Sequence, residues 1–206
     1  MWLHPRVTLQ SGHEMYYGEP SPCVLIGGVG LPWLRDLDFG TQFVRRVEGL
    51  QWPPGVVVED LSYAAHRVLH RLEELRPDKV VLVGAMPREL DPPGTVRRYL
   101  LDLTPPPPEE VHERLGEAVG GIIDLDHTLA VVRHWAGFPQ DTIVIEVEPA
   151  DREFGLGFSE EVEAVVDVVL EMVWEEVHRV VGQVERSRLF SNGHGIGPVI
   201  VGGPDG

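Results

Sequence analysis

Short apolar runs alternate along this chain with longer segments in which apolar residues recur every three or four positions. The runs lie at residues 23–26, 56–58 and 80–83, and each is followed directly by a glycine or an acidic residue; a further strand is expected at residues 142–147. Runs this short and this uniformly apolar are typical of strands buried on both faces of a parallel sheet. The alternation therefore predicts an α/β fold with an open, mostly parallel, twisted sheet and helices on both faces.

Helices are expected in the segments between these runs. Residues 62–76 place apolar side chains on one face and charged side chains on the other. Asp124 or Asp126 is expected to cap a helix that ends at Gly137. Ser159 is expected to open the last helix and not to act as a nucleophile, because the glycine that a nucleophile elbow needs two residues later is missing.

The chain of 206 residues has the size of one domain. We expect a single α/β domain at residues 21–185, preceded by an N-terminal extension at residues 1–20. A flexible, glycine-rich tail is expected at residues 186–206. Consecutive prolines at residues 105–108 predict an extended, non-helical loop on the surface of the domain.

The charge and the apolar content exclude several classes of partner. The chain has 33 Asp and Glu against 17 Lys and Arg, and its formal net charge of −16 repels the phosphates of nucleic acids. It has no run of roughly 20 apolar residues that would span a bilayer, and no signal peptide is recognised. The one cysteine, Cys23, excludes an internal disulfide. These features predict a cytoplasmic protein that binds neither nucleic acid nor membrane.

Polar residues near the ends of the predicted strands are candidate metal ligands. Asp36 and Asp38 follow the first strand, Glu59 and Asp60 follow the second, and His127 lies at the start of a helix. Carboxylate oxygens and imidazole nitrogens suit zinc or nickel, and converging loops would bring them together. The alternative is that these residues bind no metal and have only structural roles, because scattered surface acids are expected in a chain this acidic.

The glycine-rich loop after the first strand suggests a second kind of site. Gly28 and Gly30 begin a dinucleotide-binding fingerprint, but Trp33 stands at the third glycine position. Pro32 also removes a backbone donor that a phosphate would need. The alternative function is therefore a small-molecule or nucleotide-binding α/β protein that uses residues 27–30.

Several segments carry a more specific pattern. A strand and proline loop at residues 145–151 precede the motif at residues 154–159, and shorter motifs lie at residues 28–40 and 93–95. Together these segments resemble the nickel-iron hydrogenase maturation proteases, over residues 23–177.

The resemblance implies a fold, a partner and a metal. Members of this family are cytoplasmic endopeptidases with a three-layer α/β sandwich. They remove a C-terminal extension from the precursor of the hydrogenase large subunit after nickel has been inserted. The nickel that they sense belongs to the precursor, so the resemblance implies no cofactor held by the chain itself.

Transferred to this sequence, the three metal-binding positions of the family fall on Leu37, Gly84 and His127, and an asparagine of its first loop falls on Leu31. Only the histidine offers a side-chain ligand. The predicted metal ligands are therefore this histidine and acids of neighbouring loops: His127, Asp36, Asp38 and Asp60. The residues predicted to line the binding cleft are Gly28, Gly30, Leu37, Gly84 and Glu148. We expect the chain to bind the large-subunit precursor, and either to trim its C-terminus or only to escort it; no catalytic residue is identified.

Overall fold

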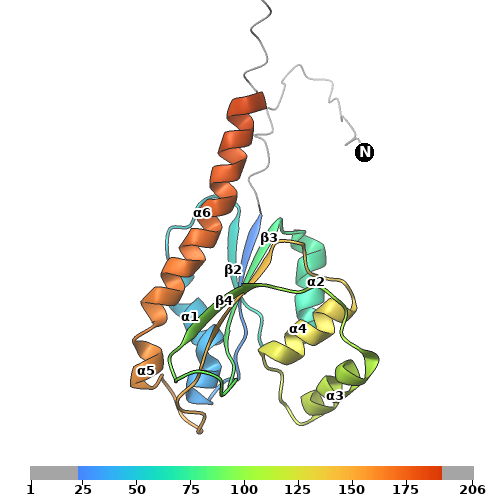
Figure 1. Ribbon diagram of the computed structural model, residues 1–206, viewed down its shortest axis with the longest axis vertical. Helices are drawn as coiled ribbons and strands as arrows, with labels where there is room; N and C mark the ends of the chain where they lie inside the picture. The colour runs from blue at the N-terminus through green and yellow to red at the C-terminus, as the bar shows by residue number, and fades with distance from the viewer. Residues whose placement is uncertain (1–22, 192–206) are drawn as a thin grey trace, which may run out of the picture.

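A five-stranded sheet forms the centre of the molecule (Figure 1). The computed structural model describes residues 23–191, with side chains to residue 182. The strand order is β2-β1-β3-β5-β4, and all strands are parallel except β4, which is antiparallel to β5. The strands are β1 (Val24–Gly28), β2 (Val56–Asp60), β3 (Lys79–Ala85), β4 (Val96–Leu100) and β5 (Thr142–Val147). The predicted open, mostly parallel sheet is confirmed.

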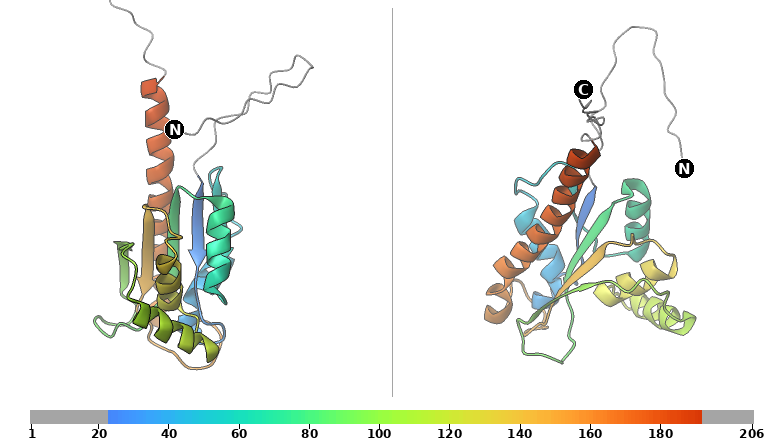
Figure 2. Two further views of the ribbon diagram at one scale, coloured as in Figure 1. Left: turned by 90° about the vertical axis from the view of Figure 1, so that its right-hand side faces the viewer. Right: turned by 45° about the horizontal axis from the view of Figure 1, so that its top comes forward.

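Helices cover both faces of this sheet and complete the predicted three-layer sandwich (Figures 1 and 2). One face carries α1 (Phe39–Val47), α5 (Glu160–Glu163) and α6 (Val166–Ser191). The other carries α2 (Ala65–Leu75) and α4 (Leu125–His134), with α3 (Pro108–Val119) packed on α4. A short 3-10 helix, η1 (Arg35–Asp38), precedes α1. No helix in the described part is long and apolar enough to cross a membrane.

The alternation of side chains along the strands divides the core into two halves. In β5, Ile143, Ile145 and Val147 pack with α1, α5 and α6, whereas Val144 packs with α2 and α4. Five buried valines of α5 and α6 lie in the first half of the core: Val162, Val166, Val169, Val173 and Val177. Each such valine stabilises the fold by about 1.5 kcal/mol or more when it leaves water.

An ion pair inside the protein also attaches α6 to the sheet. Lys79 begins β3 and Glu176 lies in α6; both side chains are only 1% exposed, and their Nζ and Oε2 atoms are 2.8 Å apart. Asp141 is a second partner, with its Oδ1 2.7 Å from the same Nζ. Two buried charges are tolerated here because each has an opposite charge in contact.

Both predicted helix caps are present. Asp124, one of the two candidates, caps α4 by accepting a hydrogen bond from the backbone N–H of His127 at 2.8 Å. Ser159 caps α5 by accepting from the N–H of Val162 at 3.3 Å. The last helix differs from the prediction, because it is interrupted between Glu163 and Val166.

Two boundaries also differ from the prediction. The last residue of the proline run, Pro108, begins α3. Proline is compatible with the first turn of a helix because the N–H there has no intrahelical acceptor. Helix α6 continues to Ser191, beyond the predicted domain end at residue 185. The extension at residues 1–20 and the part of the tail after residue 191 lie outside the described residues.

β1 and α1 approach each other closely at two glycines. A Cβ atom on Gly28 would lie 2.1 Å from the carbonyl oxygen of Gly40, and one on Gly40 would lie 2.3 Å from the backbone N and O of Val29. No side chain fits at either position. These glycines therefore allow the helix to pack directly against the strand.

Replacing Gly40 by alanine should lower the free energy of unfolding by about 3 kcal/mol, because backbone atoms would have to move apart. Gly116 in α3 is a matched control, since a Cβ there would have nothing within 4 Å. Gly116→Ala should stabilise the protein by up to about 1 kcal/mol. Urea unfolding followed by circular dichroism measures both. A Gly40→Ala protein as stable as the parent would contradict the close packing.

Candidate functional site

Three loops meet at the edge of the sheet where the parallel strands end. They are the β1–α1 loop (residues 29–38, including η1), the β3–β4 loop (residues 86–95) and the β5–α5 loop (residues 148–159). They lie together at the lower edge in Figure 1 and in the right-hand view of Figure 2. Ligands of open parallel sheets bind outside the carboxyl ends of the strands, so this edge is the candidate site.

The buried carboxylate of Asp36 joins the first of these loops to the last. Its Oδ1 accepts a hydrogen bond from the N–H of Ser159 at 2.8 Å. Its Oδ2 accepts from the N–H groups of Ala150 and Asp151, at 2.9 and 2.7 Å, and from the Ser159 hydroxyl at 2.8 Å. The side chain is fully buried, and both oxygens are engaged with the β5–α5 loop.

Backbone hydrogen bonds extend this junction. The N–H of Gly155 donates to the carbonyl of Trp33 at 2.7 Å, and the N–H of Arg35 donates to the carbonyl of Gly155 at 3.3 Å. Trp33 and Arg35 have positive φ angles of 71° and 41°. This conformation costs about 1–2 kcal/mol for a residue with a side chain. The junction therefore holds the first loop in a strained conformation, which is common at functional sites.

Glu148 holds the β3–β4 loop in a similar way. Its Oε2 accepts from the N–H of Arg88 at 3.2 Å, and its Oε1 accepts from the N–H of Glu89 at 3.0 Å. Glu89 has a positive φ of 56°. Glu148 was predicted to line a cleft, but its side chain is buried and points at the protein's own backbone.

A network of ion pairs beside this loop was missed by the sequence analysis. Glu146, buried in β5, accepts from Arg88 (Nη2, 2.8 Å), from Arg97 (Nη1, 3.4 Å) and from the Tyr99 hydroxyl (3.1 Å). Arg88 also binds both carboxylate oxygens of Asp126 at 2.8 Å. The sequence did contain one indication of this network, which is Glu146 within an otherwise apolar strand. A charge that is buried requires partners of opposite charge or hydrogen-bond donors.

The network keeps two of its members in fixed protonation states. Hydrogen bonds to Glu146 and Asp126 raise the pKa of Arg88 above its already high ordinary value, although burial opposes this. Burial raises the pKa of Tyr99, and the charge of Glu146 raises it further. Arg88 therefore remains a cation and Tyr99 a neutral hydrogen-bond donor, so neither acts as a base near neutral pH.

His127 lies at the start of α4, next to this network in the sequence. Its ring is buried, and its Nδ1 lies 2.9 Å from the backbone oxygen of Arg114. A carbonyl partner favours a proton on Nδ1, which leaves Nε2 as the acceptor atom of the ring.

Solved structures of known function share this fold. The hydrogenase maturating endopeptidase HybD from Escherichia coli is 23% identical, with a TM-score of 0.59 over 76% of this chain and 93% of its own. The hydrogenase 2 maturation peptidase of a Thaumarchaeota archaeon is 22% identical, with a TM-score of 0.54 over 76% and 98%. The maturation protease HycI from Thermococcus kodakarensis is 19% identical, with a TM-score of 0.56 over 76% and 92%.

This chain has the hydrogenase maturation protease fold. The resemblance found in the sequence is thus confirmed at the level of the fold. No protein-family model matches the sequence, and no curated protein matches it.

The three positions that the resemblance assigns to metal binding, Leu37, Gly84 and His127, do not form a metal site in this chain. At Gly84, a Cβ would lie 2.8 Å from the carbonyl oxygen of Val29 and 3.3 Å from the Leu125 side chain, so a carboxylate has no room. Leu37 has no ligand atom in its side chain. Among the residues with described side chains, no group of three or more His, Cys, Asp or Glu is placed to hold a metal ion.

The acids predicted as metal ligands instead have separate structural surroundings. Asp36 is saturated by hydrogen bonds, which corrects its assignment as a ligand. Asp38 is buried; its Oδ2 accepts from Gln42 Nε2 at 3.3 Å, and its Oδ1 has no partner among the described residues. Asp60 accepts from the N–H of Ser62 at 3.0 Å and shapes the turn after β2. The prediction that these residues bind a metal together is not supported by their contacts.

The glycine-rich loop offers a phosphate few free donors. The N–H groups of Val29, Gly30 and Leu31 donate to a carbonyl of β3, to the Ser62 hydroxyl and to a carbonyl of η1, at 2.9, 3.0 and 2.9 Å. A phosphate would have to displace these acceptors. This arrangement disfavours the nucleotide-binding alternative.

A pocket of about 240 Å³ lies beside β2 and α2 and borders the β1–α1 loop at Ser62, whose hydroxyl accepts from the N–H of Gly30. Its lining residues are Glu59, Asp60, Leu61, Ser62, Arg67, His70, Arg71 and Glu74. Arg71 is paired within it, with its Nε 2.8 Å from Glu59 and its Nη1 3.1 Å from Glu74. Arg71 is therefore engaged by two carboxylates of the protein itself and is not free to bind an anionic ligand.

Replacing Asp36 by asparagine should lower the free energy of unfolding by about 2–4 kcal/mol, because an amide NH₂ would face N–H groups that need an acceptor. Asp167→Asn, at an exposed position in the first turn of α6, is the matched control and should change stability by less than about 1 kcal/mol. Urea unfolding compares the two variants. Equal midpoints would show that Asp36 does not hold the loops together.

Asp38 should make stability depend on pH. Burial raises the pKa of this carboxyl group, although hydrogen bonds oppose the shift. The folded protein then holds the proton more tightly than the unfolded chain, so the ionised group lowers stability above the folded pKa. Asp38→Asn should raise the urea midpoint at neutral pH, and the gain should shrink towards zero near pH 4, the usual carboxyl range. A gain that is equal at both pH values would exclude Asp38 as its source.

Proposed function

We propose that this chain binds the precursor of a nickel-iron hydrogenase large subunit, or of a related metalloenzyme, as an escort that leaves the C-terminus uncut. The main support is the fold, which matches solved hydrogenase maturation proteases over at least 92% of their own lengths. Such a protein would work in the cytoplasm, the location that the sequence predicts.

We infer the absence of proteolytic cleavage from the positions that bind the metal in the maturation protease family. Leu37 and Gly84 supply no carboxylate, and Gly84 has no space for one. The carboxylate directly across the strand pair from Gly84 belongs to Glu146, its register partner in β5. That group is already paired with Arg88 and Arg97, so it is not free to replace the missing aspartate.

Of the three family positions, only His127 could contact nickel in the precursor. Its side chain is 3% exposed, so even this contact requires the ring to become accessible. A single imidazole holds nickel weakly compared with a complete set of ligands. We therefore expect the chain to bind nickel-loaded and nickel-free precursor with similar affinity.

Mixing the purified chain with nickel-loaded and with nickel-free precursor tests the proposal. Size-exclusion chromatography reports association, and intact-mass spectrometry reports cleavage. We expect both forms of the precursor to co-elute with the chain and to keep their full mass. An active maturation protease with its own precursor is the positive control for cleavage. A shortened precursor would overturn the escort role, and the absence of any association would overturn the proposed function as a whole.

A further inference from the structure

Four large apolar side chains are exposed on the three loops of the candidate site. Trp33 is 57% exposed, Leu90 79%, Phe154 78% and Leu156 70%. We call these four residues the rim. One exposed apolar residue is ordinary, but several on one edge are typical of a surface that binds a partner.

Several contacts connect the loops that carry the rim. Gly155 stands between Phe154 and Leu156, and its N–H donates to the carbonyl of Trp33. Leu90 follows Glu89, whose carboxylate lies 3.4 Å from the guanidinium of Arg152 in the β5–α5 loop. The four side chains therefore belong to neighbouring segments of one edge.

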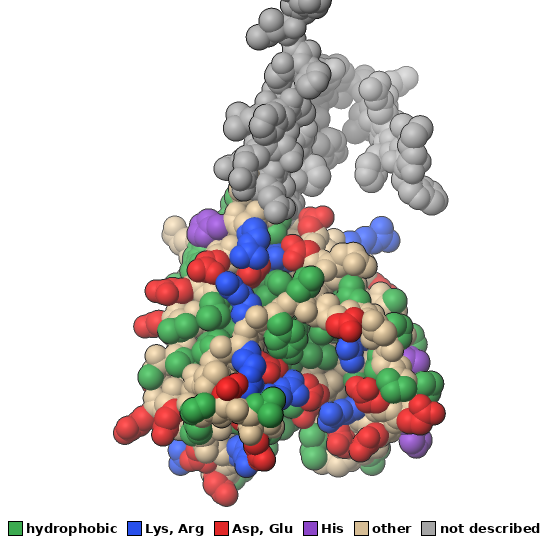
Figure 3. All heavy atoms as spheres, viewed as in Figure 1, with side chains coloured by type: hydrophobic (Ala, Val, Ile, Leu, Met, Phe, Trp, Pro, Cys, Tyr) green, Lys and Arg blue, Asp and Glu red, His purple; other side chains and the backbone are tan. Residues whose placement is uncertain are grey.

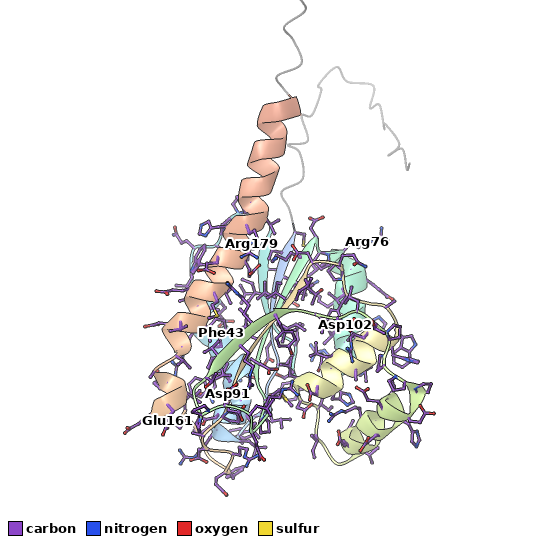
Figure 4. The ribbon with its side chains drawn as sticks, in the orientation of Figure 1. Phe43, Arg76, Asp91, Asp102, Glu161 and Arg179 are labelled. Carbon is purple, nitrogen blue, oxygen red and sulfur yellow. The ribbon has the colours of Figure 1, made fainter. Side chains whose placement is uncertain are left out.

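The β3–β4 loop also packs against α5. A Cβ on Gly94 would lie 2.7 Å from the carbonyl oxygen of Glu161. Figure 4 shows Asp91 of this loop and Glu161 of α5 near the same lower corner of the molecule. The loop that carries Leu90 is thus held beside the start of α5.

The backbone under the rim is fixed before any partner binds. Trp33 and Glu89 both have positive φ angles, and the surrounding hydrogen bonds of Asp36 and Glu148 hold their loops. A preformed surface has little conformational entropy to lose when a partner arrives. The rim is therefore suited to a specific polypeptide.

The charge around the rim indicates the chemistry of that partner. Four acidic residues of the three loops are not buried, namely Glu89, Asp91, Asp151 and Glu153, against three arginines, and the whole chain has a net charge of −16. Exposed acids include Glu89, whose side chain is 74% exposed, and acidic side chains are frequent along the lower edge of the face in Figure 3. This field attracts Lys and Arg, and it repels a second copy of the chain and anionic lipid.

The geometry points to the rim as the docking surface for an apolar segment of the large-subunit precursor that is flanked by basic residues. This inference rests on the proposed function for the identity of the partner. The rim itself is defined only by exposure, backbone contacts and charge.

The test compares two double variants. Phe154→Ser/Leu156→Ser removes two rim side chains, and Leu100→Ser/Val119→Ser removes two equally apolar residues, 63% and 91% exposed, elsewhere on the surface. Urea unfolding should give both variants the stability of the parent. In binding to the precursor, the rim variant should be weaker by about tenfold or more, because each buried large apolar side chain contributes strongly to affinity. The control variant should bind like the parent.

Two synthetic peptides test the chemistry without the precursor. Both have the same apolar residues, one flanked by lysines and the other by glutamates. The lysine-flanked peptide should bind about tenfold more tightly, should weaken as ionic strength rises, and should lose affinity for the rim variant. Equal binding of the two peptides would overturn the assigned chemistry.

The outcomes separate this inference from the proposed function. Full binding of the precursor by the rim variant would overturn the rim and leave the proposed function standing. If the parent chain fails to bind the precursor, the proposed function is overturned. If the lysine-flanked peptide still binds in a way that depends on the rim, the rim is supported as a site for apolar segments flanked by basic residues. Self-association of the parent that disappears in the rim variant, with precursor binding unchanged, would assign the surface to a second copy and overturn the inference.

Discussion

The buried carboxylate of Asp36 is the interaction on which the shape of the candidate site depends. It accepts hydrogen bonds from the backbone of Ala150, Asp151 and Ser159, residues more than 110 positions away in the chain. An ionised group that leaves water needs several donors, and here the donors come from a loop that has no other regular structure. The same contacts therefore satisfy the charge and fix the loop. From that loop, the N–H of Gly155 also donates a hydrogen bond to the carbonyl of Trp33, whose φ angle is positive.

Other buried carboxylates near this edge also bind the protein itself. Glu148 accepts from backbone N–H groups of the β3–β4 loop, and Glu146 is surrounded by Arg88, Arg97 and Tyr99. These groups stabilise loop positions and ion pairs, and none is presented as one of a set of metal ligands among the described residues. The chain thus combines the maturation protease fold with an edge whose buried acids have structural roles. For this reason we favour binding over cleavage.

Local pattern was sufficient to predict most of the elements. The apolar runs that became β1, β2 and β3 are short and uniform, and such runs are stable only where both faces are covered. The caps at Asp124 and Ser159 were recognisable because a cap depends on residues three positions apart. The helix that begins at Pro108 was missed, because a run of prolines suggests an extended chain until the following residues are seen to pack.

The candidate site was predicted less well, for a physical reason. Whether Asp36 binds a metal or a loop depends on which donors surround it, and those donors come from the other end of the domain. Likewise, Glu146 and Arg88 are far apart in the sequence. Glu146 lies in β5 and Arg88 follows β3, so the two residues become neighbours only when these two strands pair. Short-range periodicity was enough for the sequence by itself to determine the α/β fold, and the motifs at residues 28–40, 93–95 and 145–159 carried the resemblance to the maturation proteases. Only the tertiary structure decided the roles of the buried carboxylates and the position of the exposed rim, because a charge or an apolar side chain acts through neighbours that the folded chain supplies.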